Sequence, residues 1–285
     1  VVLEEIAGVE DTPDDLVFEL HGLRFWKGHG YGRSILGTRD TVSSLGIEDL
    51  RRVHKERYGG RNILVGCTGD IEHDHVVDLV ARFFGEAPAG TLSPEVESPD
   101  GNMVGFDFVR RDTSQTHLVL GRATPAYADP IRVVLGLISG AFGGGMSSRL
   151  FQRVREELAL AYAIFSFQTF YSRAGSAGVY VGTRPETADR TLETIFSEYR
   201  HLYESALSQP ELDQAKSQAS GQLVLSMEST AAQLLRTMGF ALRNEPYRSL
   251  DDSLSRIEAV TMDQVKGACR RYFNPDDQYV LSLGP

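Results

Sequence analysis

One helix–turn–strand pattern occurs twice in this chain of 285 residues, and it constrains the fold more than any other feature. The first copy runs from Ile47 to Val65 and the second from Met262 to Val280. In each copy an amphipathic helix ends at an aromatic residue, and a turn of equal length leads into an apolar strand. The match predicts a duplicated domain, one copy ending near residue 90 and the other at the C-terminus. Two unrelated helix–strand units are the alternative.

The order of the remaining elements favours an α+β fold. Hairpin-like pairs of strands stand beside runs of helices, which is typical of antiparallel or mixed sheets rather than of a doubly wound parallel sheet. Residues 85–103 are rich in proline and glycine and poor in apolar residues, so they are predicted to be a linker. The sequence therefore predicts the C-terminal part of a first domain over 1–90 and a second domain over 104–285.

Local signals define several elements within these domains. Thr12 and Pro13 suit the N-cap and first position of a helix that runs to about Trp26. Its apolar face is predicted to carry Leu16, Leu20 and Leu23. A helix is also predicted from Ser147 through Leu158, and capping boxes are predicted at Ser208 with Glu211 and at Thr261 with Gln264. Strands are predicted over 62–67, 104–109, 116–123 and 278–283, with a hairpin over 162–171 and 175–182.

Composition excludes several functional classes. Hydrophobic residues make up 41% and charged residues 24%, as in a globular protein. The net charge of −10 argues against non-specific nucleic-acid binding, and no apolar run approaches the roughly 20 residues of a membrane span. Cys67 and Cys269 belong to no C-x-x-C pair and are interpreted as small buried hydrophobes. This usage fits a reducing compartment, so a cytoplasmic location is predicted, with periplasmic or secreted locations as alternatives.

The beginning of the chain carries a family resemblance. The stretches Val1–Ile6 and Glu10–Asp15, followed by Tyr31–Thr38, resemble the segment of pitrilysin/insulinase-family peptidases that supplies the last zinc ligand. In that family two histidines of an H-x-x-E-H helix bind zinc, its Glu acts as general base, and a Glu on a later helix completes the site. The resemblance places that later Glu at Glu5. Glu4 is the neighbouring alternative, and a solvated helix face is the ordinary interpretation of either residue.

The chain departs from the family in one respect, because no H-x-x-E-H occurs in it. The closest histidine cluster, His73 and His75, has an i, i+2 spacing that does not put both rings on one helix face, so it is interpreted as a solvated loop. The resemblance implies zinc as cofactor, with the remaining ligands on an N-terminal segment missing from these residues. Val1 begins what reads as the middle of a helix, so further residues are expected upstream.

A second match is more specific. The run Phe142–Gln152, continued by Val154–Glu157 and Leu160–Tyr162, resembles the signature of the family's C-terminal domain. There an Arg and a Tyr seven residues apart contact substrate, and they fall on Arg155 and Tyr162. By resemblance, Tyr162 donates a hydrogen bond to the oxyanion or substrate carbonyl, and Arg155 anchors substrate backbone or a carboxylate. Otherwise Arg155 would simply pair with a neighbouring Glu, and Tyr162 would be an ordinary strand residue.

Two glycine patterns have competing interpretations. Gly143–Gly145 lacks the G-K-[ST] ending of a phosphate loop and no strand directly precedes it, so the resemblance makes it a turn near the substrate chamber. In the strand that ends before Arg184, Gly178, Tyr180 and Gly182 alternate with valines. Its small face implies either close packing or room for a peptide added at a sheet edge.

The resemblance covers nearly the whole chain and implies its function. It implies two similar α+β domains per subunit, usually paired as a homodimer around a closed chamber, and a zinc metalloendopeptidase that hydrolyses peptides or unfolded segments. The missing segment could also come as a separate chain. The rival hypothesis is a non-catalytic scaffold or partner subunit of the same fold, and a third is a peptide-binding module without catalysis.

Overall fold

The structure is a computed structural model that describes residues 1–100 and 103–285. Its residues form two compact units that interleave along the sequence. The first unit holds residues 1–39, 97–219 and 255–285, and the second holds residues 40–96 and 220–254. The continuous domains 1–90 and 104–285 remain a prediction.

The first unit is built on one mixed five-stranded sheet of order β1-β5-β2-β4-β3. β5 pairs parallel with β1, whereas β2–β5, β2–β4 and β3–β4 are antiparallel. β3 lies at one edge and forms a hairpin with β4, as predicted. This arrangement confirms the α+β class. The strands are β1 (Gly105–Arg110), β2 (Thr116–Thr124), β3 (Ala161–Phe170), β4 (Gly175–Thr183) and β5 (Tyr279–Gly284).

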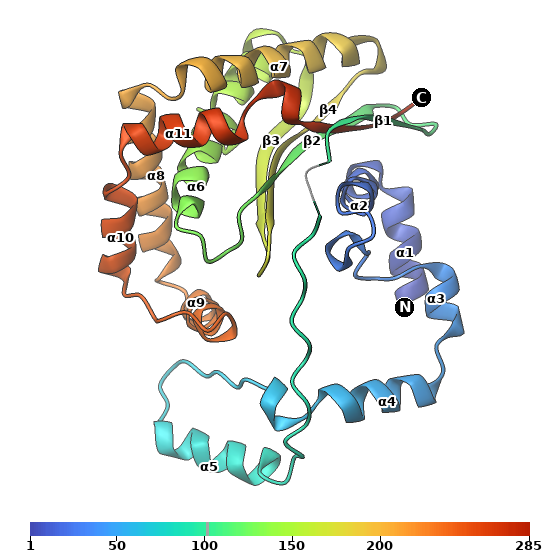
Figure 1. Ribbon diagram of the computed structural model, residues 1–285, viewed down its shortest axis with the longest axis vertical. Coiled ribbons are helices and arrows are strands. Elements are labelled where there is room, and N and C mark those ends of the chain that lie inside the picture. The colour runs from blue at the N-terminus through green and yellow to red at the C-terminus, as the bar shows by residue number, and fades with distance from the viewer. Residues whose placement is uncertain (101–102) are drawn as a thin grey trace. The chain divides into compact units, whose positions relative to one another are not determined.

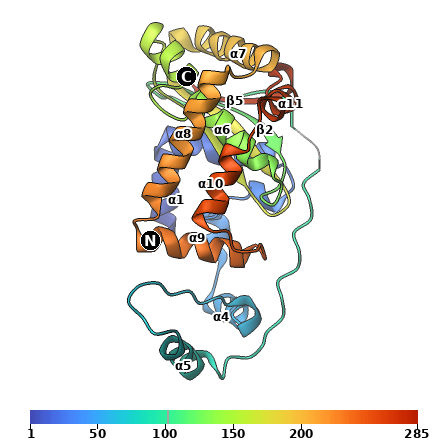
Figure 2. The ribbon, with the colours of Figure 1, turned by 90° about the vertical axis from the view of Figure 1, so that its left-hand side faces the viewer.

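The three inner strands of this sheet, β5, β2 and β4, are buried on both faces. Leu118 and Leu120 of β2 belong to one apolar cluster, while Val119 between them belongs to the other. Helices α6, α7 and α11 cover the first face and α2 covers the second (Figure 1). Figure 2 shows α6, α7 and α11 gathered around the same sheet from another side. These helices are α2 (Pro13–Phe25), α6 (Ile131–Gly143), α7 (Ala188–Ser205) and α11 (Met262–Tyr272).

Helix α2 follows α1 (Val2–Asp11) and begins at Pro13, as the sequence predicts. Leu16 is buried in the cluster beneath the sheet and Leu20 packs against it, but Leu23 is 55% exposed. The prediction for Leu23 was wrong. The side of α2 that faces the strands carries the buried His21 and Phe25, and Leu23 lies outside it. His21 fits there because Gly121 of β2 has no side chain: a Cβ would lie 2.9 Å from the His21 ring.

The repeated pattern is confirmed over its helix and turn. α4 (Ile47–Arg57) and α11 have the same length, and each is followed by a 3-10 turn, Gly60–Asn62 or Pro275–Asp277. All four boundaries are displaced by 215 residues (47 to 262, 57 to 272, 60 to 275 and 62 to 277).

The strand predicted over 62–67 is wrong for the described residues, although its counterpart forms β5. β5 is hydrogen-bonded on both sides, to β1 and to β2. Among the described residues no strand pairs with the first copy, and Leu64 and Val65 remain 44% and 47% exposed. A strand needs hydrogen-bonding partners for its backbone, so the sequence pattern alone does not produce one.

The second unit is mainly helical. It holds α3 (Arg39–Ser44) from Asp40 onward, α4, α5 (His73–Phe84) and α9 (Thr230–Leu242). Apolar residues of the segment 63–67, α5 and α9 surround a pocket of about 840 Å³. The predicted linker has no helix or strand over 85–100, while Gly101 and Asn102 lie outside the described residues.

Two further helices, α8 (Gln209–Ser226) and α10 (Leu250–Glu258), each have residues assigned to both units. Both predicted capping boxes form: Glu211 accepts from the Ser208 backbone N–H at 2.7 Å, and Gln264 accepts from the Thr261 backbone N–H at 2.9 Å. Within residues 1–100 and 103–285, no helix is both long and apolar enough to cross a membrane.

Candidate functional site

A pocket of about 380 Å³ lies in the first unit, where β2 begins, β4 ends and β3 begins. Arg155 and Tyr162, which the sequence singles out, both line it; Glu5 does not. The structure therefore brings two of the three predicted site residues together. The lining residues are Gln115, Arg155, Glu156, Ala159, Leu160, Ala161, Tyr162, Gly182, Thr183 and Arg184.

Arg155 is carried by a π-helix. The helix predicted through Leu158 is wound as π over Phe151–Glu157, a wide form that is rare and frequently occurs at functional sites. Val154 is fully buried and anchors this turn. The guanidinium carbon of Arg155 lies 4.6 Å from the ring centroid of Phe151 and 5.2 Å from that of Tyr162. Two aromatic rings therefore hold the cation through cation–π attraction.

The ordinary surface pairing on this helix is made by a different arginine. Arg153 donates to Glu157 at 2.6 Å, one turn along the helix. Arg155 has only Glu156 nearby, and the closest approach, from Nε to the carboxylate, is 3.8 Å. That distance is too long for a hydrogen bond, so the N–H groups of Arg155 are left for another partner.

A strained loop connects the π-helix to β3. Ala159 has a φ of 49°, a left-handed conformation that costs a non-glycine residue on the order of 1 kcal/mol. The neighbouring Leu160 carbonyl accepts a hydrogen bond of 2.6 Å from the Thr183 hydroxyl of β4. The Thr183 hydroxyl also contacts the Thr191 hydroxyl of α7 at 3.1 Å. The end of β4 thus holds the loop in the conformation that aims Tyr162.

Tyr162 lies in a β-bulge. Ala161 pairs with Thr183 and Ala163 pairs with Gly182, so Tyr162 is the extra residue of β3. A bulge redirects the side chain of the extra residue. The Tyr162 side chain is accordingly 79% exposed on an edge strand, beside the Arg155 guanidinium.

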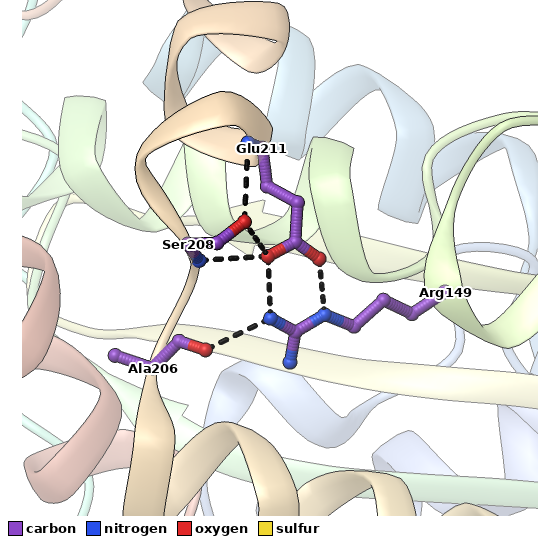
Figure 3. A network of polar contacts seen from close by, with 4 residues as sticks. All are labelled: Arg149, Ala206, Ser208 and Glu211. Carbon is purple, nitrogen blue, oxygen red and sulfur yellow. Dashed lines mark hydrogen bonds and ion pairs between the residues drawn. The ribbon is translucent and has the colours of Figure 1, made fainter.

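A polar network anchors the segment that leads into the π-helix (Figure 3). Arg149 donates two hydrogen bonds to the carboxylate of Glu211, one of them 2.7 Å long, and a third of 2.9 Å to the Ala206 carbonyl. Ser208 donates to the same carboxylate from its backbone and its hydroxyl. The hydrogen bonds from Arg149, with those from Ser208, lower the pKa of Glu211 to about 2, so this carboxylate is ionised at neutral pH.

Glu5 lies in the first turn of α1, with its side chain exposed. Glu4 is exposed as well, whereas Ile6 is the buried residue of this helix. The histidine pair expected in a loop instead begins helix α5, and both His73 and His75 are exposed. Within the described part of the chain no three His, Cys, Asp or Glu residues are grouped as metal ligands would be. These residues alone therefore do not fit a complete zinc site.

The glycine patterns serve close packing. A Cβ on Gly143 would lie 2.7 Å from the Ser166 backbone nitrogen of β3, so this glycine lets the end of α6 approach the sheet. β4 is paired on both sides, by β2 and β3, which leaves no edge for an added peptide. A Cβ on Gly178 would lie 2.0 Å from the Leu120 carbonyl oxygen. Close packing is therefore the correct interpretation of the small face of this strand.

Sequence reasoning gave no site role to four lining residues: Gln115, Ala159, Thr183 and Arg184. Arg184 was visible as a strand-to-helix junction, but nothing in the sequence placed it in the pocket that Arg155 lines. Gln115 precedes β2, and only the pairing of β2 with β4 brings it to Gly182. The left-handed Ala159 has no sequence signal, because glycine is the residue usual in that conformation.

Comparisons with known proteins agree with one another. The model of a family described as "Peptidase M16 inactive domain" matches residues 44–219. An uncharacterized zinc protease of Streptomyces coelicolor is 35% identical over 278 residues, covering 94% of this chain and 60% of that protein. One of Bacillus subtilis is 31% identical over 283 residues, covering 99% and 68%. The chain thus spans about three fifths to two thirds of these relatives.

Solved structures show the same fold. A peptidase M16 inactive domain from Pseudomonas fluorescens superposes with a TM-score of 0.92 at 24% identity, covering all of this chain and 68% of that one. A protease from Helicobacter pylori gives 0.88 at 19% identity, covering 100% and 70%. A chain of complex III2 from Candida albicans gives 0.88 at 18% identity, covering 99% and 69%. The family match and the curated relatives together establish that this chain belongs to the M16 family of peptidases, the family of the pitrilysin/insulinase resemblance.

Proposed function

We propose that this chain is part of a zinc metalloendopeptidase that hydrolyses peptides or unfolded segments, with Glu5 as one zinc ligand and with Arg155 and Tyr162 in contact with substrate. The observation that carries the proposal is the convergence of Arg155 and Tyr162 on one pocket. A π-helix, a left-handed alanine and a β-bulge all occur within the twelve residues Phe151–Tyr162. Such irregularities are concentrated at functional sites.

In this proposal Tyr162 and Arg155 act on the substrate directly. The exposed Tyr162 hydroxyl donates a hydrogen bond to the scissile carbonyl oxygen, which gains negative charge in the transition state. The Arg155 guanidinium, held between the Phe151 and Tyr162 rings, binds the peptide through N–H groups that Glu156 does not occupy. Because Arg155 and Tyr162 lie on the two sides of one short loop, their spacing is fixed before substrate arrives, which reduces the entropy lost on binding.

Zinc requires ligands that the described residues do not supply. Glu5 is an exposed carboxylate in the first turn of α1, which suits a metal ligand but provides one of three. The proposal takes the other ligands, and the general base, from outside these 285 residues. When bound, zinc would supply an activated water and polarise the substrate carbonyl.

The second unit supports a contribution from additional polypeptide. Its copy of the repeated pattern has a helix and a turn like those that precede β5 in the first unit. Residues 64–69 occupy the positions that correspond to β5, yet no strand in the described part of the chain pairs with them. Apolar side chains surround the pocket of about 840 Å³ next to this segment. The curated relatives are also longer than this chain. We propose that a complete second sheet and a homodimer together enclose the peptide, or that the missing segment arrives as a separate chain.

The two cysteines are free, Cys67 exposed and Cys269 buried, which supports a reducing compartment and hence a cytoplasmic location within this proposal. The exposure of Cys67 departs from its interpretation as a buried hydrophobe. Like Leu64 and Val65, it belongs to the segment whose neighbouring strands are absent from the described residues.

A non-catalytic scaffold or partner subunit is the second candidate. It is favoured by one observation, the fold match to a chain of complex III2 from Candida albicans. A scaffold requires neither an exposed carboxylate at position 5 nor a guanidinium with free N–H groups at position 155. The combination of Glu5, Arg155 and Tyr162 in one chain therefore favours the peptidase.

The decisive experiment measures hydrolysis of an internally quenched fluorescent peptide by the protein purified from its own host. The peptidase hypothesis expects turnover that a chelator abolishes and that stoichiometric Zn²⁺ restores. Absence of turnover in a preparation that contains one zinc per chain would favour the scaffold.

A further inference from the structure

Two arginines line the Arg155–Tyr162 pocket, and neither guanidinium has a hydrogen-bonded partner among the described residues. Arg155 comes from the π-helix and Arg184 follows the last residue of β4. Arg155 approaches only the Glu156 carboxylate, at 3.8 Å, and Arg184 forms no ion pair with any residue in the described ranges. Other arginines of this unit hold carboxylates of the chain itself, as Arg149 holds Glu211 and Arg122 holds Asp277. The pocket thus contains two cations whose N–H donors are free for a ligand.

The lining of the pocket carries a net positive charge, two arginines against one glutamate, although the chain carries a net charge of −10. Glu156 is the one acidic residue in the lining, and its side chain is 54% exposed to solvent. Beside Gly182 lie His117 and Tyr180, whose Nδ1 and hydroxyl oxygen are 2.9 Å apart. Burial lowers the pKa of His117 and raises the pKa of Tyr180 to about 12, so both are neutral at pH 7 and do not offset the two guanidinium charges.

The pocket also offers room and neutral hydrogen-bonding groups. Gly182 leaves space for two polar groups at the pocket, because a Cβ there would lie 2.9 Å from the Gln115 side-chain oxygen and 3.2 Å from the Tyr180 hydroxyl. The volume of about 380 Å³ lies near the lower end of the range for small-ligand pockets, roughly 300–1,000 Å³. A group of one or two amino-acid residues fits this volume. The Gln115 carboxamide and the Tyr162 hydroxyl add neutral donors at its rim.

We infer that this pocket binds a carboxylate of the peptide substrate, with Arg184 acting beside Arg155 as a specificity-determining residue. Guanidinium groups match carboxylates with two parallel N–H···O bonds, which are the strong, charge-assisted kind. The inference rests on the proposed function for its peptide ligand and adds the chemistry that selects among peptides. Two sources supply this chemistry: the C-terminal carboxylate of a short peptide and the side chain of an acidic residue within a longer one.

The test measures binding alone, so it does not depend on zinc or on turnover. A fluorescein-labelled penta-alanine peptide is titrated with the protein in the presence of a chelator, and anisotropy gives Kd. Three forms are compared: the free C-terminal acid, the C-terminal amide, and the amide with a central glutamate. We expect at least one carboxylate-bearing form to bind about tenfold or more tightly than the plain amide. Preference for the free acid identifies the chain terminus as the source, and preference for the glutamate form identifies the side chain.

Variants then assign the preference to Arg184. Arg184→Ala is expected to remove most of it, while Arg184→Lys, which keeps the charge but loses the bidentate geometry, retains part. Arg190→Ala is the matched control, because Arg190 is also exposed, lies six residues further along and is absent from the pocket lining. Thermal unfolding checks that each variant is folded. Equal Kd values for all three peptides, or an Arg190→Ala loss equal to that of Arg184→Ala, would overturn the inference.

The binding result also separates this inference from the proposed function. A protein that discriminates carboxylates but hydrolyses no peptide after zinc repletion would retain the carboxylate site and lose the peptidase assignment. A protein that hydrolyses peptides without discriminating carboxylates would keep the peptidase assignment and lose the carboxylate site.

Discussion

The Arg155 guanidinium lies 5.2 Å from the ring centroid of Tyr162, because a left-handed residue between them turns the chain back on itself. Seven residues separate the two in sequence, and on a regular helix that spacing spans about two turns, roughly 10 Å. The π-helix ends at Glu157 and β3 begins at Ala161. The turn at Ala159 between them brings the Arg155 guanidinium against the Tyr162 ring. The pairing of these side chains is thus a property of the loop.

The first prediction concerns Tyr162. Tyr162→Phe keeps the ring over which Arg155 lies and removes only the hydroxyl. If this hydroxyl stabilises the oxyanion, kcat should fall by about 10²–10³-fold with little change in KM. Steady-state kinetics on the quenched peptide measure both constants. An effect on KM alone would make Tyr162 a binding residue, and no effect on either would remove it from the site.

The second prediction concerns Glu5. Glu5→Gln removes the negative charge that a zinc ligand needs, so zinc retention after dialysis against a weak chelator should fall by about tenfold or more. Elemental analysis of the dialysed protein gives the zinc content. Glu4→Gln is the control, since Glu4 is equally exposed on the same turn of α1. The assignment moves to Glu4 if that variant, and not Glu5→Gln, loses zinc.

The third prediction concerns the network that Glu211 forms with Arg149. The ordinary carboxyl pKa is 4.5 and the folded-state value is about 2, so the ionised form is stabilised in the folded state. Its contribution is therefore complete above about pH 4.5 and is lost as pH falls towards 2. Glu211→Gln should lower the free energy of unfolding at pH 7 by about 2 kcal/mol, allowing for partial exposure.

Urea denaturation at several pH values measures this effect. The free energy of unfolding of Glu211→Gln should change less between pH 4.5 and 2 than that of the native chain. Glu157→Gln, which breaks the exposed pair with Arg153, should change stability much less than Glu211→Gln does. Comparable losses in the two variants would mean that Glu211 gains nothing from its partly buried position.

The fourth prediction concerns His21, which is buried against Phe25 and Tyr279. Burial lowers the pKa of His21 to about 3, from an ordinary value of 6.5. Between these pH values the unfolded chain binds a proton that the folded chain does not. The free energy of unfolding therefore has its full value above about pH 6.5 and falls as the pH drops towards 3. The slope from this group approaches about 1.4 kcal/mol per pH unit.

His21→Leu removes the titrating group. The free energy of unfolding of this variant should depend less on pH between 6.5 and 3, whatever the variant's stability at pH 7. Chemical denaturation across this range provides the measurement, and Tm at fixed pH serves as a check. An unchanged slope would show that His21 titrates normally in the folded protein.

The sequence predicted the elements that are stabilised by residues close together in the chain. The Pro13 helix start and the Thr261–Gln264 capping box depend on residues a few positions apart, and both form. Asn62–Cys67 has the composition of a strand, but its stability depends on neighbouring strands that the described residues do not provide. Leu23 has the right spacing for a buried position, and the helix packs through His21 and Phe25 instead.

The candidate site follows the same division. The resemblance alone indicated Arg155 and Tyr162, whereas their contact, the π-helix around Arg155 and the bulge at Tyr162 come from tertiary packing. Arg184 joins them only through the antiparallel register of β3 with β4. The role of Glu5 stays a prediction, because α1 places it on an exposed turn apart from the Arg155–Tyr162 pocket.

The position of β5 has a consequence for how the protein folds. This strand comes from residues 279–284, yet it lies between β1 and β2, whose residues are made more than 150 positions earlier. During synthesis β1 therefore has no place in the sheet until the chain has been made almost to its end. Contacts this distant in sequence slow folding, and the unpaired edges of β1 and β2 are exposed in the meantime. A chain truncated before Tyr279 would keep both edges open permanently, and aggregation is its expected fate.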